Sequence, residues 1–396
     1  MRPEVMVDAF AGLIPGGGIG RYVRDLSAAL TGLPGAPPAR FAFPRNFRDR
    51  ARAAYRPERL HELPHPWWRL RLLYTAGTLA PLRFDRMFGE PAVLHSPVGY
   101  GPTFDRTRLI DHVHDLTTLE HPEWHPIRAN QFLRATIPHA ARHASVVLTH
   151  SAFIGRRVVE VLGVDPARVV TIPPPLGHCF TPVPLDASRS RVKRRFGLDG
   201  EFILHVGTLE PRKNHLSLIG AFERLRRAGF PGPLVLVGQD GWKTRPIQRR
   251  IETSPEAGAI LRIRDADDRD LAALYGACTA CAYPSLEEGF GMPLLESMAC
   301  GAACVTSEHA SLLELGAGCA LAVPARDEEA LAETLAALWT DPDLRGRVAG
   351  PGPARAAAYT FERWAPRIFA LYRRELEAAG VAASGVGAVA APPVRP

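Results

Sequence analysis

Residues 288–296 combine two carboxylates, two glycines and a helix start. Glu288 and Glu296 bracket the stretch, and Pro293 stands where a first helical position favours proline. The free backbone N–H groups of such a first turn, together with the helix dipole, suit an anion. Carboxylates accept hydrogen bonds from hydroxyls, and glycines let a ligand approach the backbone. This stretch predicts a cradle for a sugar nucleotide, with Glu296 on the first helical turn. A capped surface helix is the simpler alternative.

A second stretch with suitable chemistry lies upstream. The apolar run 202–206 predicts a buried strand that leads into a glycine turn with Arg212 and Lys213, before a helix predicted over 214–228. Arg offers a planar fork and Lys a compact point charge, and both neutralise a diphosphate. Only three of the 48 Lys and Arg residues are lysines, and one of them stands here. We therefore interpret this turn as a phosphate-handling element.

The two stretches together resemble a known family. Gly-Thr-Leu-Glu-Pro-Arg-Lys-Asn at 207–214, followed by Glu-Gly-Phe-Gly-Met-Pro-Leu-Leu-Glu at 288–296, is similar to the retaining family-4 glycosyltransferases with the GT-B fold. The resemblance runs from the loop at Gly16 to the last helix, and is closest to bacterial mannosyl- and rhamnosyltransferase-like members that build surface polysaccharides. It implies an α/β fold with two Rossmann-like parallel-sheet domains facing an interdomain cleft. The expected parts are an acceptor-binding domain (1–180), a nucleotide-sugar-binding domain (181–360), a helix crossing back to the first domain (361–380) and a disordered tail (381–396).

The same resemblance assigns roles to individual residues. His114 contacts the donor sugar, and Asp115 positions it or the adjoining backbone. Glu288 holds hydroxyls of the donor sugar and Glu296 the ribose, while Arg212 and Lys213 stabilise the leaving diphosphate. The remaining donor-binding residues that we expect are Gly17, Gly18, Phe290, Gly291, Leu294 and Leu295.

Two further motifs could be mistaken for metal sites. His112 and His114 flank Val113 between two aspartates, but we see no third ligand in the sequence and expect His112 to be structural. Cys278 and Cys281 match C-x-x-C. Strand alternation should place them on opposite faces, so we expect buried free thiols. We accordingly predict no metal site.

The rest of the chain alternates strands with helices, as in a parallel sheet. The loop 16–20 fails the G-x-G-x-x-G fingerprint because Arg21 replaces the third glycine, which disfavours nicotinamide binding. We expect residues 34–66 to be a loop region with one short helix, and Ser151 to N-cap a helix over 152–162. Further predicted strands are 5–7, 92–95, 108–110, 146–149, 169–172, 234–237, 259–263, 277–283, 302–306 and 319–323; further predicted helices are 21–30, 189–196, 246–253, 267–275, 327–339 and 361–378, with a turn at 311–314.

The net charge of +7 is unevenly distributed along the chain. Residues 40–86 alone contain 11 Arg against 4 acidic residues, together with Trp67 and Trp68. Such a segment suits an anionic membrane surface or is a solvated basic face, and nothing in the sequence matches a nucleic-acid-binding motif. Asp8 comes too early for a signal peptide, and the longest uncharged run is too short for a membrane span. We expect a cytoplasmic protein, with peripheral membrane contact through 40–86 as one alternative.

The expected activity is metal-independent transfer of a hexose, of mannose or rhamnose type, from a nucleotide diphosphate sugar to an acceptor hydroxyl. The resemblance favours GDP-mannose as donor, a lipid-linked or oligosaccharide acceptor, and no cofactor. Two alternatives remain: a nucleotide-sugar epimerase of the same fold and a natural-product glycosyltransferase.

Overall fold

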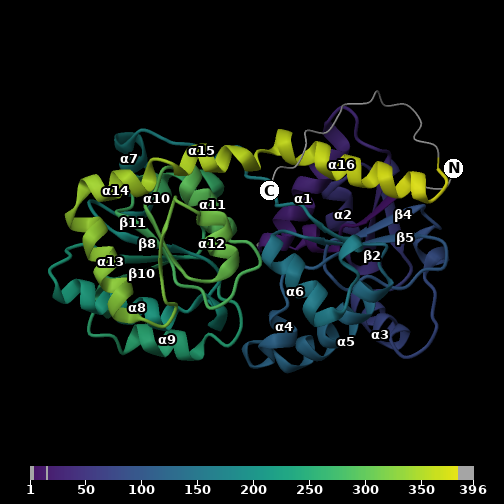
Figure 1. The fold of residues 1–396 in the computed structure, drawn as a ribbon, viewed down its shortest axis with the longest axis horizontal. Coiled ribbons are helices and arrows are strands. Elements are labelled where there is room, and N and C mark those ends of the chain that lie inside the picture. The colour runs from purple at the N-terminus through teal and green to yellow at the C-terminus, as the bar shows by residue number, and fades with distance from the viewer. Residues whose placement is uncertain (1–3, 15–16, 382–396) are drawn as a thin grey trace. The chain divides into compact units, whose positions relative to one another are not determined.

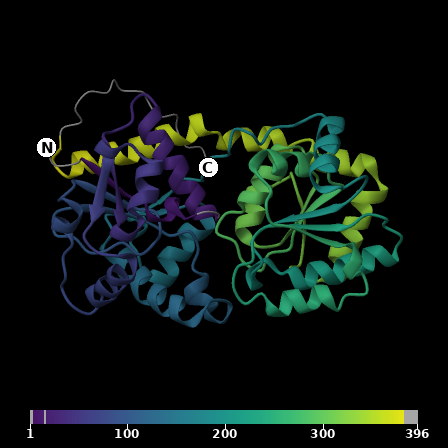
Figure 2. The same ribbon diagram turned by 180° about the vertical axis from the view of Figure 1, so that it is seen from behind.

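The computed structural model describes residues 4–14 and 17–381, and the tail predicted to be disordered lies, beyond Val381, outside them. The chain divides into two compact units. Unit 1 contains residues 1–120, 127–175 and 362–396, and unit 2 contains residues 121–126 and 176–361. Each unit is a parallel sheet covered by helices (Figures 1 and 2).

Unit 1 is built on a seven-stranded parallel sheet in the order β3-β2-β1-β4-β5-β6-β7. Its core strands are short and buried because helices cover both faces of such a sheet. The strands are β1 (Val5–Asp8), β2 (Ala39–Pro44), β3 (Leu60–Leu63), β4 (Val93–Ser96), β5 (Arg108–His112), β6 (Val146–Thr149) and β7 (Val169–Thr171). The helices are α1 (Gly18–Gly32), α2 (Arg48–Ala54), α3 (Trp67–Gly77), α4 (Thr117–Glu120), α5 (Ile127–His143), α6 (Ala152–Leu162) and α16 (Phe361–Ala378).

The last helix, α16, is tied to the sheet of unit 1. Tyr372 Oη lies 2.7 Å from His95 Nδ1 on β4, and Arg108 on β5 pairs with the buried Glu375 at 2.8 Å. Trp364 and Tyr372 are buried on the apolar face of this amphipathic helix. Residues near the end of the chain therefore help to close the core of its first part (yellow helix, Figure 1).

Unit 2 repeats this architecture with six parallel strands in the order β10-β9-β8-β11-β12-β13. One core layer contains α10 and α11, and the opposite layer contains α8 and α13. The strands are β8 (Ile203–Val206), β9 (Leu234–Val237), β10 (Ile260–Ile263), β11 (Ala280–Tyr283), β12 (Cys304–Ser307) and β13 (Leu321–Val323). The helices are α7 (Leu185–Phe196), α8 (His215–Arg227), α9 (Arg245–Glu252), α10 (Asp268–Ala277), α11 (Met292–Ala299), α12 (Ala310–Gly316), α13 (Glu328–Thr340), α14 (Pro342–Ala349) and α15 (Gly352–Ala356).

Both sheets reverse their strand order next to the first strand of the unit. In unit 2, β8 pairs with β9 on one side and with β11 on the other. The strand that follows β8 in the chain is therefore added on one side of it, and the strand that follows β11 is added on the opposite side of the sheet. Ligands of open α/β sheets bind outside the carboxyl ends of the strands at such a switch point. The loops after β8 and β11 are the two stretches that the sequence analysis singled out.

Two sequence predictions about the fold are wrong. Residues 34–66 contain β2, α2 and the edge strand β3 rather than a loop with one short helix. Their Arg-rich, Pro-rich sequence hides the strands, because Arg40 interrupts the buried run of β2 and β3 is an edge strand that pairs on one side only. The predicted turn at 311–314 is part of α12, which forms without the proline that the family often has there. In contrast, β6, β9, α6 and α16 have the predicted bounds, and Ser151 caps α6 by accepting from the Ile154 amide at 3.2 Å.

Candidate functional site

A buried ion-pair cluster joins the loops after β8 and β11. Glu288 accepts from Arg212 Nη1 at 2.7 Å through Oε2 and from Lys213 Nζ at 2.5 Å through Oε1. Ser285 Oγ donates to the same Oε1 at 2.9 Å, and Arg212 Nη2 reaches Glu210 at 2.8 Å. Three residues proposed from two separate motifs thus form one contact network.

The local backbone explains why two neighbouring cations both point into the site. Residues 211–213 form a single 3-10 turn, which Asn214 ends in the left-handed conformation at φ 56°. Asn214 Nδ2 donates to the Pro284 carbonyl at 3.0 Å, and the Leu286 amide donates to the Arg212 carbonyl at 2.8 Å. These bonds fasten the two loops to each other, so the turn cannot swing its side chains away from Glu288.

Glu288 is held as a carboxylate. Burial by itself raises its pKa, but the charges of Arg212 and Lys213 and the hydrogen bonds from Lys213 and Ser285 outweigh burial and lower the pKa well below the usual value. An ionised carboxylate accepts hydrogen bonds and donates none. Glu288 can therefore accept from sugar hydroxyls but cannot act as a general acid near neutral pH.

The residues around the cluster hold the 285–291 loop from a second side. Ser311 on α12 donates to the Glu288 carbonyl at 2.7 Å, and its Oγ lies 2.9 Å from His309 Nδ1. The other nitrogen of His309 lies 2.6 Å from Glu287 Oε2. The sequence analysis did not predict that His309 and Ser311 support the loop. Both residues lie at the start of α12, where the sequence analysis predicted a turn, and the contacts depend on this helix.

Helix α11 begins directly after this loop. Its N-cap Gly291 has φ 103° and provides no side-chain cap, and Pro293 is the second residue of the helix. A Cβ at Gly291 would lie 2.7 Å from Leu312 Cδ2, so the position requires glycine for both its backbone angle and its space. The uncapped amide groups of this first turn form an N-terminus of the kind that binds phosphate.

Glu296 has a partner outside the ion-pair cluster. It is the fifth residue of α11, one residue further into the helix than predicted, because the helix starts at Met292 and not at Pro293. Its Oε2 accepts from Tyr275 Oη at 3.0 Å, and both side chains are buried. The predicted neighbours Phe290, Leu294 and Leu295 are buried in the apolar core between α10 and α11, so any contact with a ligand there is through the backbone.

The predicted residues of unit 1 lie at the carboxyl ends of its strands. His114 follows β5, and its Nε2 lies 2.6 Å from the Pro97 carbonyl after β4. Burial lowers its pKa, against the opposing effects of that bond and of the Asp115 charge, so the ring is neutral at pH 7. Asp115 Oδ1 accepts from the Thr117 amide and hydroxyl at 3.0 and 2.6 Å at the start of α4. Asp115 therefore fixes the local backbone.

The glycine loop of unit 1 opens α1. Gly17 is the N-cap at φ 75°, without a side-chain cap, and Gly18 is the first helical residue. No atom lies within 4 Å of a Cβ built on either glycine, so the space beside this backbone is open. Both glycines, which the sequence analysis expected to bind the donor, are exposed.

Two arguments that the sequence analysis made about the C-x-x-C and His-x-His motifs are wrong. Cys278 precedes β11 as the C-cap of α10, so strand alternation does not apply, and its Sγ lies 3.5 Å from Cys281 Sγ. Both are nevertheless free thiols, and Cys281 is buried as predicted, whereas Cys278 is only partly buried. The histidine pair does have a third neighbour: His150, directly after β6, places a ring nitrogen within 4.8 Å of nitrogens of His112 and His114. Sequence spacing could not reveal it, because the contact depends on β5 and β6 being adjacent strands.

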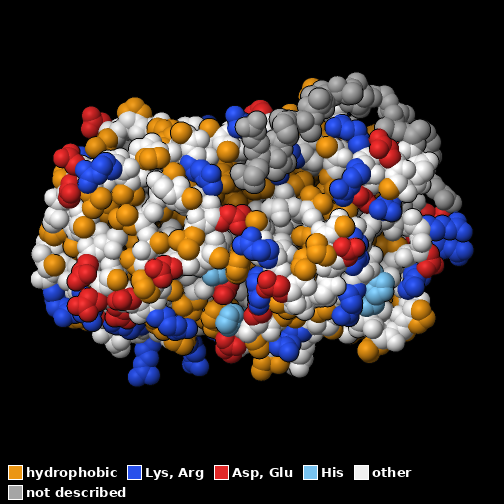
Figure 3. Space-filling model, in the orientation of Figure 1, with side chains coloured by type: hydrophobic (Ala, Val, Ile, Leu, Met, Phe, Trp, Pro, Cys, Tyr) orange, Lys and Arg blue, Asp and Glu red, His pale blue; other side chains and the backbone are white. Residues whose placement is uncertain are grey.

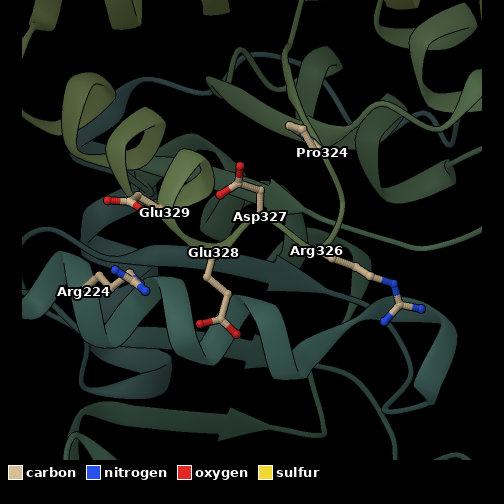
Figure 4. Close-up of a pocket in the computed structure, with 6 residues that line it drawn as sticks. All are labelled: Arg224, Pro324, Arg326, Asp327, Glu328 and Glu329. Atoms are coloured by element: carbon tan, nitrogen blue, oxygen red, sulfur yellow. The ribbon is translucent and has the colours of Figure 1, made fainter.

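A shallow pocket elsewhere on unit 2 does not share this chemistry. It lies between α8 and the start of α13, and in Figure 4 Glu328 points toward α8 while Arg326 extends to the right of the view. Its lining residues are Arg224, Pro324, Arg326, Asp327, Glu328 and Glu329. Asp327 caps α13 by accepting from the Ala330 amide at 2.9 Å, which gives this acidic group a structural role.

Comparison with protein-family models matches both units. Residues 16–176 match the model "Glycosyltransferase Family 4", and residues 186–352 match "Glycosyl transferases group 1". The chain belongs to the family-4 glycosyltransferases. It is accordingly an enzyme of the glycosyltransferase class, as the paired motifs predicted.

Curated relatives of this family-4 glycosyltransferase include proteins from Escherichia coli. The chain is 27% identical over 283 residues to O-antigen chain mannosyltransferase B, covering 71% of this chain and 74% of the relative. It is 34% identical over 180 residues to the serotype-specific mannosyltransferase WbdA, covering 43% of this chain and 22% of that protein. The chain therefore spans about three quarters of the first relative but under a quarter of WbdA.

Solved glycosyltransferase structures share the fold. Anabaena Alr3699/HepE, in complex with UDP and glucose, aligns with a TM-score of 0.71 at 18% identity, over 93% of this chain and 98% of its own. WaaG, a glycosyltransferase involved in lipopolysaccharide biosynthesis, aligns with a TM-score of 0.69 at 17% identity, over 93% and 99% of the two chains. These likenesses confirm the predicted GT-B class, with its two Rossmann-like parallel-sheet domains.

Proposed function

We propose that this glycosyltransferase transfers a hexose of mannose type from a nucleotide diphosphate sugar, with GDP-mannose favoured, to a hydroxyl of an oligosaccharide or lipid-linked acceptor. The observation that carries the proposal is the Arg212–Lys213–Glu288 cluster at the switch point between β8 and β11. The mannosyltransferase relatives support the choice of sugar and a role in polysaccharide assembly.

The leaving group determines what the cations must do. As the bond between the anomeric carbon and the β-phosphate oxygen breaks, negative charge develops on that oxygen. Arg212, Lys213 and the first-turn amides of α11 would stabilise this charge, in a site that excludes most water because Lys213 is only 8% exposed. Electrostatic stabilisation of this kind needs no metal at the diphosphate.

The acids would recognise the rest of the donor. Glu288, kept ionised by its two cationic neighbours, would accept from hydroxyls of the sugar, and Glu296, oriented by Tyr275, would accept from the ribose. His114, with Nε2 bonded to the Pro97 carbonyl, would present its other nitrogen to the donor sugar. Gly17 and Gly18 would supply backbone amides to the diphosphate or the acceptor.

Retention of anomeric configuration belongs to the proposal. The acids next to Glu288 in the described cluster are engaged with basic side chains: Glu210 accepts from Arg212, and Glu287 lies 2.6 Å from His309 Nε2. A front-face substitution, in which the acceptor attacks from the side that the diphosphate leaves, requires no protein nucleophile. The departing phosphate oxygen then takes the proton from the acceptor hydroxyl.

Contact with an anionic membrane surface would bring the enzyme to a lipid-linked acceptor. On α3, Trp68 and Leu72 are 64% and 63% exposed one turn apart, and Leu79 beyond the helix is 89% exposed. The arginines of residues 40–86 accompany these apolar groups, a combination that favours headgroups of anionic lipids. On the face shown in Figure 3, Lys and Arg side chains are interspersed with Asp and Glu. Every helix in the described ranges is too short or too polar to span a bilayer.

The test is a donor screen with product analysis. Purified full-length protein is incubated with GDP-, UDP- and dTDP-sugars, with and without oligosaccharide acceptors, and release of nucleoside diphosphate is measured. We expect acceptor-dependent GDP release from GDP-mannose and a product whose NMR coupling shows the anomeric configuration of the donor. Conversion of the nucleotide sugar without release of GDP would instead identify an epimerase and overturn the proposal.

A further inference from the structure

Three histidine side chains converge at the carboxyl edge of the unit 1 sheet. The rings of His112 and His114 are stacked with centroids 4.2 Å apart, and the His150 ring lies 4.2 Å from His112 and 5.0 Å from His114. One nitrogen from each residue lies within 4.8 Å of the other two. We call this group the histidine cluster.

The fold brings the three residues together through adjacent strands. His112 ends β5 and is in register with Leu148 on β6, so His150, two residues further along, comes to the same edge. The Val113 amide donates to the Leu148 carbonyl at 2.9 Å and continues the pairing just beyond β5. The cluster is therefore supported by strand ends rather than by a free loop.

Hydrogen bonds to backbone carbonyls assign the tautomers of two rings. His114 Nε2 lies 2.6 Å from the Pro97 carbonyl and must donate to it, which makes Nδ1 the unprotonated nitrogen. His150 Nδ1 lies 3.2 Å from the Ile172 carbonyl and likewise donates, which makes Nε2 its basic nitrogen. Histidines that bind metals are oriented in this way, with one N–H fixed on a carbonyl and the other nitrogen ligating.

His112 provides the observation that points to a ligand. Its side chain is fully buried, and neither ring nitrogen has a hydrogen-bond partner. Leaving a buried polar group without a partner costs about 1–3 kcal/mol, so such groups call for an explanation. The Tyr22 hydroxyl, whose ring contacts His112 edge-on at 4.9 Å, is also buried without a partner. Two unsatisfied polar groups thus adjoin the point where the three imidazoles meet.

We propose that the histidine cluster binds one divalent transition-metal ion of the Zn²⁺ class through His112, His114 and His150. Imidazole nitrogens suit Zn²⁺, Co²⁺, Ni²⁺ and Cu²⁺ and do not suit Mg²⁺ or Ca²⁺, which require oxygen ligands. A tetrahedral Zn²⁺ with Zn–N bonds of about 2.0–2.1 Å needs nitrogens roughly 3.4 Å apart. The nitrogens, which now lie within 4.8 Å of one another, would have to come closer by rotation of the side chains, with the fourth position left to water or to an oxygen of a ligand.

The metal would belong to unit 1 and would leave the diphosphate-binding role of unit 2 unchanged. Because His114 is also the residue proposed to contact the donor sugar, a bound metal is expected to lower turnover. That effect rests on the proposed function, whereas metal binding itself does not. The experiment below therefore measures binding without any sugar nucleotide.

The experiment titrates the metal-free full-length protein with Co²⁺ and records visible absorption. We expect one equivalent to give the strong d–d bands of a four-coordinate site and to be displaced by Zn²⁺. Zinc-edge X-ray absorption of the wild-type complex should report three imidazole ligands. His112→Leu and His150→Gln should each weaken binding at least tenfold, while His143→Gln, on the exposed end of α5, should bind like the wild type.

The outcomes separate this site from other histidines. Absence of a four-coordinate spectrum in the wild type, or fewer than three imidazoles at the zinc edge, would overturn the proposal even if a variant failed to fold. Unchanged affinity in both His112→Leu and His150→Gln would also overturn it, because the metal would then lie elsewhere. Weakened binding in both, with native circular dichroism, supports it.

Discussion

Lys213 Nζ lies 2.5 Å from Glu288 Oε1, although 75 positions separate the two residues in the chain. Each belongs to a different βα loop, and the two loops follow strands that pair with each other across the switch point of unit 2. Arg212 also forms an ion pair with the Glu288 carboxylate, so two cations pair with one buried anion. This relationship turns two short motifs into one charged site with a net positive charge on these three groups, as a diphosphate requires.

Replacing Tyr275 by Phe tests whether Glu296 binds the donor. The substitution removes the hydrogen bond of 3.0 Å that orients the Glu296 carboxylate and changes nothing else in volume. We expect the KM for the nucleotide sugar to rise roughly three- to tenfold with little change in kcat, because binding of the ribose is lost equally in ground and transition states. Steady-state kinetics at varied donor concentration gives KM and kcat separately.

Tyr372→Phe is the matched control for that experiment. It also removes a buried hydroxyl bond, the one of 2.7 Å to His95, but in unit 1. Both variants should lose about 1 kcal/mol of stability, and only Tyr275→Phe should change the donor KM. Equal donor KM values in the two variants would contradict the proposal that Glu296 binds the donor.

Gly291→Ala tests the start of α11. Alanine at φ 103° is strained, and its Cβ would meet Leu312 Cδ2 at 2.7 Å. Gly301→Ala, at the other end of the helix, has φ 75° but open space, so it isolates the cost of the backbone angle. In urea unfolding we expect Gly301→Ala to lose about 1–2 kcal/mol and Gly291→Ala about 1–3 kcal/mol more. Equal losses would show that Leu312 does not confine this turn.

Asp111 predicts a pH dependence of stability. Burial raises its pKa to about 7, against the opposing hydrogen bond from the Gly101 amide. An acid whose pKa is higher in the folded state binds its proton more tightly there. Its contribution to the free energy of unfolding is therefore fully present at low pH and is lost as the pH rises from 3.8 to about 7. Asp111→Asn, which cannot ionise, should therefore become more stable than the wild type by ~1–3 kcal/mol as pH rises from 4 to 8. Urea unfolding across this range measures the difference, and a difference independent of pH would contradict the shifted pKa.

The sequence predicts the regular parts of the fold because their signals are local. Strands such as β6 and β9 are short, largely apolar runs. Helix α6 begins after Ser151, a residue type that favours the N-cap position. The strands β2 and β3 escape such analysis because Arg40, His61 and Glu62 interrupt their apolar pattern. Their strand character comes from pairing: β2 lies between β1 and β3 in the sheet, and β3 pairs with β2.

The site is predictable to a similar degree. The motifs identify Arg212, Lys213 and Glu288, and the structure brings these three together. His309, which contacts Glu287 beside the cluster, and Tyr275, which contacts Glu296, have no sequence signal of their own because their roles depend on which helices pack nearby. His150 joins the histidine cluster for the same reason, through neighbouring strands rather than through spacing.

The central claim is that the cation pair and Glu288 act on a sugar diphosphate, and turnover of Lys213→Ala and Glu288→Gln measures it most directly. Lys193→Ala, which removes an exposed lysine paired with Asp199, is the control. With the donor that the wild type uses best, and native circular dichroism for each protein, we predict that both site variants lose at least about 100-fold in kcat/KM for nucleotide release. Lys193→Ala should remain within about twofold of the wild type, as expected for an exposed ion pair. Folded Lys213→Ala and Glu288→Gln proteins with turnover close to that of Lys193→Ala would contradict the account.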